Sequence, residues 1–124
     1  MRKQYHCRPS GSGLDAWDVD RLVALVASEP VEEVALADIA DIDREYWYDH
    51  GYAPTVRSVV EHCRLIAEVD LDYPLVLDPD GRVMDGMHRV ARALLEGRSV
   101  IAAKRLKTLP PPDFRGCSLE ELPY

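Results

Sequence analysis

The residue types best suited to chemistry lie together in one short stretch, Asp85-Gly86-Met87-His88-Arg89. A strand is expected to end here and a helix to begin, and the first turn of a helix offers unpaired backbone N–H groups and a partial positive charge. Gly86 has no side chain to block an approaching group. Arg89 can donate two hydrogen bonds to phosphate oxygens, and His88 can donate one. The stretch therefore predicts an anion site that suits a phosphate.

A plainer interpretation of the same stretch stays open. Asp85 would then be an ordinary N-cap and Arg89 a surface residue. Cations are favoured at the C-terminal ends of helices, so a His-Arg pair in the first turn opposes the helix dipole. Local costs of this kind gather at functional positions, which favours the phosphate site.

Periodic apolar residues and turn residues predict the elements that position this stretch. Helices are expected at 15–29, 55–69 and 87–96, and strands at 31–37, 75–78, 82–85 and 99–106. The Asp78-Pro79-Asp80-Gly81 sequence predicts a hairpin turn between two of these strands. Residues 1–13 are expected to form a short strand or a loose arm, and the segment after Pro110-Pro111-Pro112 to be extended and docked, or loose. The order predicts one mixed α/β or α+β domain over residues 1–124.

Composition limits the classes of function. The 124 residues carry 15 basic and 22 acidic side chains, a net charge of −7, which disfavours general binding to DNA. No apolar run approaches a membrane span, and the N-terminus lacks the apolar core of a signal peptide, so we expect a cytoplasmic protein.

Three cysteines and four histidines raise the question of a metal site. His6-Cys7 and His62-Cys63 are adjacent pairs, and four such groups could form a tetrahedral zinc site. Adjacent side chains point in different directions on a helix or strand, so both members of a pair rarely reach one metal. We therefore expect no metal site, no disulfide framework, and a buried Cys63 beside a surface His62.

The segment 40–53 gathers four aromatic residues: Tyr46, Trp47, Tyr48 and Tyr52. Its sequence has no period, so a loop or a short helical turn is expected. The segment could be a lid packed on the core, a stacking surface for a base, or the interface of a homodimer.

The Asp85-Gly86-Met87-His88-Arg89 stretch, followed by an alanine-rich helix, Gly97 and a strand, resembles the ParB N-terminal domain / sulfiredoxin superfamily. The resemblance covers about residues 31–106 and leaves 107–124 as a Pro-rich tail. It implies a small mixed sheet flanked by helices, in a small stand-alone bacterial member of the family. Members include ATP-dependent sulfiredoxins, CTP-binding ParB proteins, free serine kinases and proteins labelled nucleases. Their shared property is nucleotide phosphate held at this helix start, which implies ATP or another nucleotide with Mg²⁺ here.

The resemblance also implies roles for individual residues. His88 and Arg89 match the phosphate-binding pair of the family, with Asp85, Gly86 and Met87 in the same turn. The Thr55-Val56-Arg57-Ser58-Val59 segment resembles the sulfiredoxin segment that faces the phosphates, so Thr55 and Ser58 are further candidates. Alternatively, these two residues only cap the helix and present a solvated hydroxyl.

Two departures from the family pattern narrow the reaction. Met87 stands where sulfiredoxins carry their catalytic cysteine, and a thioether cannot form a thiolate, so the protein is not expected to be a sulfiredoxin. The serine kinases place an acidic base near the end of the first strand. Asp41 or Asp43 could take that catalytic role, or these acids are only solvated. Because the sequence continues for only about twenty residues after residue 106, we do not expect a DNA-loading ParB protein, which needs further domains.

Three functions follow from these features. The first is a nucleotide-dependent phosphotransferase or hydrolase that acts on an unknown small-molecule acceptor. The second is a non-catalytic nucleotide-sensing module with a protein partner. The third, a ParB-like nuclease, is the weakest, because the cations are scattered instead of forming a track for a nucleic-acid strand.

Overall fold

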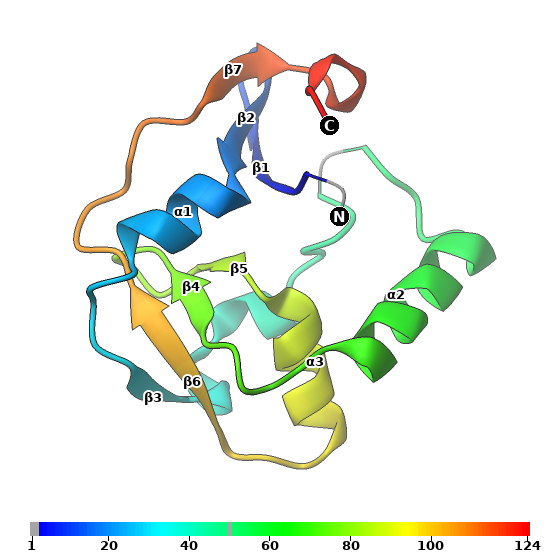
Figure 1. Cartoon of the computed structure of the whole chain (residues 1–124). Coiled ribbons are helices and arrows are strands. Elements are labelled where there is room, and N and C mark those ends of the chain that lie inside the picture. The colour runs from blue at the N-terminus through cyan, green and yellow to red at the C-terminus, as the bar shows by residue number, and fades with distance from the viewer. Residues whose placement is uncertain (1–2, 50) are drawn as a thin grey trace.

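The structure is a computed structural model that describes residues 3–49 and 51–124. Met1 and Arg2 of the expected N-terminal arm, and His50 of the aromatic segment, lie outside the described residues. In the part described, two small sheets combine with three α-helices, which confirms the mixed α+β class (Figure 1).

The central sheet holds the strands around the Asp85–Arg89 turn. Its order is β3-β6-β4-β5, with bounds of Glu32–Ala35, Val100–Arg105, Leu75–Leu77 and Val83–Asp85. β4 runs parallel to β6, and the other neighbours are antiparallel. α3 (Met87–Leu95) starts two residues after β5 and leads back to β6, with Gly97 just past its end at a φ of 73°. The predicted hairpin, helix 87–96 and last strand are therefore confirmed.

Alternation along β4 and β5 gives the central sheet two apolar faces. Leu75, Leu77 and Val83 belong to the larger core cluster, which includes the buried face of α3. Val76 and Met84 belong to a second cluster with Trp17 and with Leu22 of α1. Successive side chains of a strand point to opposite faces, so these short strands can be buried on both sides.

The N-terminal region corrects the expected helix at 15–29. Residues up to 18 form a hairpin of β1 (Tyr5–Ser10) and β2 (Gly13–Asp18), and α1 covers only Val19–Leu25. Of the apolar residues behind that prediction, Leu22, Val23 and Leu25 lie in α1, and Val26 follows its last residue. Asp18 caps α1 by accepting a hydrogen bond from the Asp20 N–H. The preceding residues are instead held by strand pairing on both sides, a non-local effect that the local pattern does not reveal.

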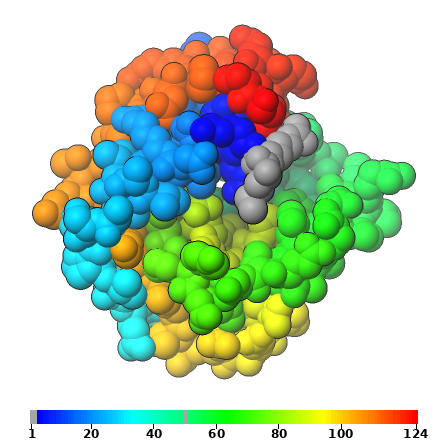
Figure 2. Space-filling view, viewed as in Figure 1, coloured from blue at the N-terminus to red at the C-terminus, as the bar shows by residue number. Residues whose placement is uncertain are grey.

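The C-terminal segment docks on this hairpin. β7 (Phe114–Cys117) pairs with β2, so the second sheet has the order β1-β2-β7. The Trp17 indole donates to the Pro110 carbonyl at 2.8 Å. Figure 2 shows the C-terminal residues lying against the N-terminal strands. The segment expected as docked or loose is therefore docked.

The remaining segments frame the aromatic residues. β3 is followed by two short 3-10 helices, Leu36–Asp38 and Ala40–Asp43, and a third lies at Leu119–Glu121. α2 (Val56–Glu68) agrees with the predicted helix 55–69 to within one residue at each end, and Thr55 caps it by accepting from the Ser58 N–H. No residue of α2 is fully buried, however. Within the described residues, no helix is long and apolar enough to cross a membrane.

Candidate functional site

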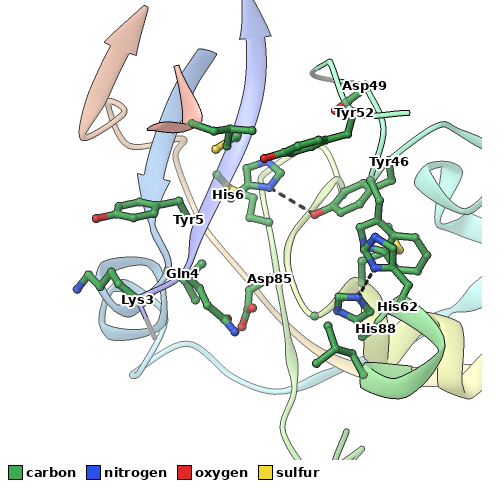
Figure 3. Close-up of a pocket in the computed structure, with 18 of the residues that line it drawn as sticks. Lys3, Gln4, Tyr5, His6, Tyr46, Asp49, Tyr52, His62, Asp85 and His88 are labelled. Carbon is green, nitrogen blue, oxygen red and sulfur yellow. Dashed lines mark hydrogen bonds between the residues drawn. The ribbon is translucent and has the colours of Figure 1, made fainter. Parts of the chain in front are cut away.

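A cleft of about 590 Å³ opens beside the start of α3. β1 contributes His6 to its wall, the aromatic segment contributes Tyr46 and Trp47, and α2 contributes His62. Residues 85–88 line it from the strand-to-helix turn. Figure 3 shows the labelled side chains of this wall, which come from segments far apart in the sequence: His6, Tyr46, His62, Asp85 and His88. The volume lies in the range of small-molecule sites.

A pair of histidines forms one wall of the cleft. His62 Nδ1 and His88 Nε2 are 2.8 Å apart, a hydrogen-bond distance at which one ring donates and the other accepts (Figure 3). Trp47 stacks on both rings, with centroid distances of 4.1 Å to His62 and 4.8 Å to His88. Burial, and secondarily the charge of His62, lowers the pKa of His88 to about 4, and burial also lowers the pKa of His62. His88 is therefore neutral at physiological pH and offers polar ring nitrogens instead of a positive charge.

A second chain of hydrogen bonds crosses the cleft floor. Arg8 Nε donates to His6 Nε2 at 2.9 Å, so His6 carries its proton on Nδ1, which lies 3.3 Å from the Tyr46 hydroxyl. The hydroxyl then donates to the Val83 carbonyl at 2.7 Å. Burial is the main cause that raises the pKa of Tyr46. These contacts fix the aromatic segment onto β1 and β5, so Tyr46 is a packed wall of the site.

The turn at Gly86 has a different structural basis from the one expected. Gly86 has a φ of 105°, a left-handed conformation, and a Cβ there would lie 2.6 Å from Leu75 Cδ2 and 2.7 Å from Arg89 Nη2. The Arg89 side chain folds over the glycine, pairs with the Asp85 carboxylate at 2.9 Å and donates to the Tyr73 carbonyl at 3.1 Å. The glycine thus makes room for Arg89. Arg89 is not among the residues that line the cleft, and its contacts favour a positioning role for the turn.

Asp85 does not cap α3, because Gly86 is the N-cap and makes no side-chain cap hydrogen bond. The first turn of α3 therefore begins without a capping side chain. Gly86, Met87 and His88 all line the cleft at this point. The helix start, with its partial positive charge, faces the cleft without a carboxylate cap.

The two acids proposed as catalytic bases lie elsewhere. Asp41 is only 2% exposed and accepts a hydrogen bond from the Val83 N–H at 2.8 Å. It also pairs with Arg44 at 3.3 Å and with Arg82 at 3.5 Å. Asp43 is exposed on the same 3-10 helix. Neither residue lines the cleft, so the structure gives Asp41 a structural role in holding β5.

Thr55 and Ser58 make the helix-capping contacts that were the alternative to phosphate binding. Thr55 caps α2, and the Ser58 hydroxyl donates back to the Thr55 carbonyl at 2.9 Å. Ser58 also lies 3.2 Å from the Tyr48 hydroxyl. Neither residue lines the cleft. The structure therefore brings together 85–88 of the predicted set and leaves Thr55, Ser58, Arg89 and both acids outside the cleft lining.

The sequence reasoning missed three cleft residues: His6, Tyr46 as a hydrogen-bonding group, and His62. His62 was expected at the surface beside a buried Cys63, whereas His62 is partly buried and Cys63 is exposed. The available signal was its spacing of four from Ser58, which places both on one face of α2. Cys7 also lines the cleft, but burial raises the pKa of its thiol to about 11, so it is not a thiolate near neutral pH.

The cleft shows no metal centre of its own in the part of the chain that the structure describes, since no group of three or more His, Cys, Asp or Glu side chains there could hold a metal ion.

Comparisons with protein-family models, curated proteins and solved structures find no match. The family resemblance therefore stays a prediction that depends on residues 85–89 and on the order of the elements.

Proposed function

We propose that this protein binds a nucleotide in the cleft, with the phosphates at the start of α3. The observation that carries the proposal is the opening of the cleft onto a helix start that has no side-chain cap, through Gly86, Met87 and His88. Backbone N–H groups at such a position bind anions without a dedicated lysine. The strand-turn-helix placement of Asp85 to Arg89 is the context in which the family resemblance implies phosphate binding.

The other walls of the cleft suit the rest of a nucleotide. Tyr46, Trp47 and the half-exposed Tyr52 line it, and aromatic rings stack on bases whatever their sequence. His62 and His88 add neutral ring nitrogens that can donate to or accept from ribose hydroxyls or phosphate oxygens.

A divalent cation would enter this site with the phosphates. Mg²⁺ usually binds proteins through one or two carboxylates plus phosphate oxygens, and keeps several waters. Asp85 is a carboxylate that lines the cleft beside the start of α3, so it could hold a phosphate-bound Mg²⁺ together with phosphate oxygens and water. The cation would neutralise phosphate charge, which matters in a chain with a net charge of −7.

The geometry supports binding more directly than catalysis, because both proposed bases lie outside the cleft lining. We therefore propose first that the protein is a non-catalytic nucleotide-sensing module. The His62–His88 pair favours one second candidate, a nucleotide hydrolase. The neutral imidazole of His62 can accept a proton from an attacking water, and the hydrogen-bonded ring of His88 can orient His62.

Calorimetric titration with ATP, ADP, CTP, GTP and inorganic phosphate, with and without Mg²⁺, tests the proposal. Leu65 lines the cleft one turn after His62 and is 36% exposed, so it accepts a charge without loss of a core contact. Leu65→Glu should weaken nucleotide binding and Leu65→Lys should strengthen it, each by roughly threefold to tenfold. Because the two substitutions should change the nucleotide affinity in opposite directions, a general effect on folding cannot explain both results. Equal changes in both variants, or no binding of any nucleotide by the wild-type chain, would refute the proposal.

The hydrolase form has its own test. Release of phosphate under Mg²⁺ should be lost in His62→Gln while nucleotide affinity changes little, because the amide can still hydrogen-bond but cannot accept a proton at neutral pH. Binding without any phosphate release would leave the sensing module as the function.

A further inference from the structure

α2 carries an apolar surface that the fold leaves exposed. We call it the α2 stripe, and it consists of Val56, Val59, Val60, Cys63 and Ala67. Val56 is 83% exposed and Val60 is 58% exposed. Successive steps of four, three and four residues along Val56, Val60, Cys63 and Ala67 keep these side chains on one side of the helix. This spacing is the one that helices use to pack against another helix.

The stripe does not face the body of the protein. The partly buried positions of α2 include Ser58 and His62, which make contacts with Tyr48 and His88. At 100° per residue these positions lie on a different side of the helix from Val60 and Cys63. Figure 1 shows α2 at the periphery of the molecule, packed along α3 and with its outer side facing no other element.

A charged flank runs beside the stripe. Four exposed residues with alternating sign form it: Arg57, Glu61, Arg64 and Glu68. Within the helix, Arg64 pairs with Glu61 at 2.7 Å and with Glu68 at 3.5 Å. All four lie within a narrow arc on one side of the stripe. The flank is thus a row of charges that read plus, minus, plus, minus along the helix.

The order of these charges is complementary to itself in one arrangement. When two copies of a helix pack antiparallel through one stripe, the same flank of each copy meets across the interface. With the two-fold axis midway between positions 62 and 63, Arg57 faces the partner's Glu68, and Glu61 faces the partner's Arg64. Each charge then meets one of opposite sign, and the exposed Cys63 lies next to the axis.

We propose that the α2 stripe is a homodimer interface, in which α2 packs antiparallel against α2 of a second copy. The alternating charges select a second copy and set its direction, while the valines supply the apolar contact. The face of α2 that carries His62, which lines the cleft, stays turned toward the cleft. The proposal therefore stands whether or not a nucleotide binds there.

Sedimentation over a concentration series gives the first test, on wild-type chain and on variants of exposed valines. The wild-type chain should be a dimer, and Val60→Glu should raise the dimer dissociation constant at least about tenfold. Val23→Glu is the matched control, because Val23 is 48% exposed but belongs to α1. A monomer at every concentration, or a dimer that Val60→Glu leaves unchanged, would overturn the proposal.

Charge variants test the antiparallel direction. Glu61→Arg alone and Arg64→Glu alone should each weaken the homodimer, because like charges then face each other across the axis. An equimolar mixture of the two variants should recover the wild-type affinity as a heterodimer. Loss of the intrahelical pairs is the same in the mixture as in the separate variants, so recovery can only come from contact between chains. A mixture no tighter than its components would refute the antiparallel pairing.

Oxidative cross-linking locates the axis. In a Cys7→Ser/Cys117→Ser background, mild oxidation should link two chains through Cys63, and Val60→Glu should suppress the link. Failure to cross-link in a chain that sediments as a dimer would place the interface elsewhere and overturn the proposal.

Discussion

The buried carboxylate of Asp41 gives the sharpest test of how the site is held. It accepts the Val83 N–H at 2.8 Å and lies 3.5 Å from Arg82 Nε, a buried atom that has no hydrogen-bond partner among the described residues. Asp41→Ala would leave the Val83 N–H unpaired inside the core. A lost hydrogen bond to a charged group, with its partner left buried, costs about 2–3 kcal/mol of unfolding free energy. At roughly 3–5 °C per kcal/mol for a chain of this size, the melting temperature should fall by about 10 °C.

Urea unfolding followed by tryptophan fluorescence measures this effect. Asp41→Asn keeps an oxygen for the Val83 N–H and should cost less, about 1 kcal/mol. Asp43→Ala is the control, since Asp43 is exposed on the same 3-10 helix and should stay within about 0.5 kcal/mol of wild type. If Asp41→Ala is as stable as Asp43→Ala, the structural role of Asp41 is wrong.

Three further predictions concern the walls of the cleft. The pKa of His88 is about 4 in the folded chain, below its ordinary 6.5, so between these pH values the unfolded chain binds one more proton than the folded chain. The free energy of unfolding should therefore decrease as the pH is lowered from 6.5 to 4. His88→Gln should flatten that slope when urea unfolding is measured over this pH range. Gly86→Ala should lower the free energy of unfolding by about 2–3 kcal/mol in thermal unfolding, because its Cβ would clash with Leu75 and Arg89. Gly97→Ala should cost only the strain of the left-handed backbone, about 1 kcal/mol, because no described atom lies within 4 Å of the added Cβ. Equal losses in the two variants would contradict this explanation. Tyr46→Phe should cost about 1 kcal/mol in the same assay through loss of the bond to the Val83 carbonyl, and no loss would mean that the bond adds nothing.

The sequence predicted the central sheet and two of the helices, because local signals and tertiary packing agree there. The hairpin turn at 78–81, the glycine after α3 and the alternation in β4 and β5 are all short-range features. The N-terminal hairpin was mistaken for part of a helix, because β2 depends on pairing with both β1 and β7. β7 lies about 100 residues away in the sequence, so no local window contains that signal.

The candidate site was predicted only in its strand-to-helix turn. Asp41 and Arg89 have side chains that suit catalysis and phosphate binding, but buried charges are often used to satisfy backbone groups, and residue type alone does not separate the two uses. The prediction of a buried Cys63 on α2 was also wrong. A periodic apolar stripe indicates a helix surface that can pack, but it does not show whether the partner surface belongs to the same chain.

A titration that observes the histidine rings tests the central claim most directly. The ring protons of His62 and His88 are followed by NMR while a nucleotide with Mg²⁺ is added. The account predicts saturable shifts of both rings with at least one of ATP, ADP, CTP and GTP, and the same saturation point in calorimetry. Rings that stay unchanged while a nucleotide binds, or the absence of binding by all four, would contradict nucleotide binding in this cleft.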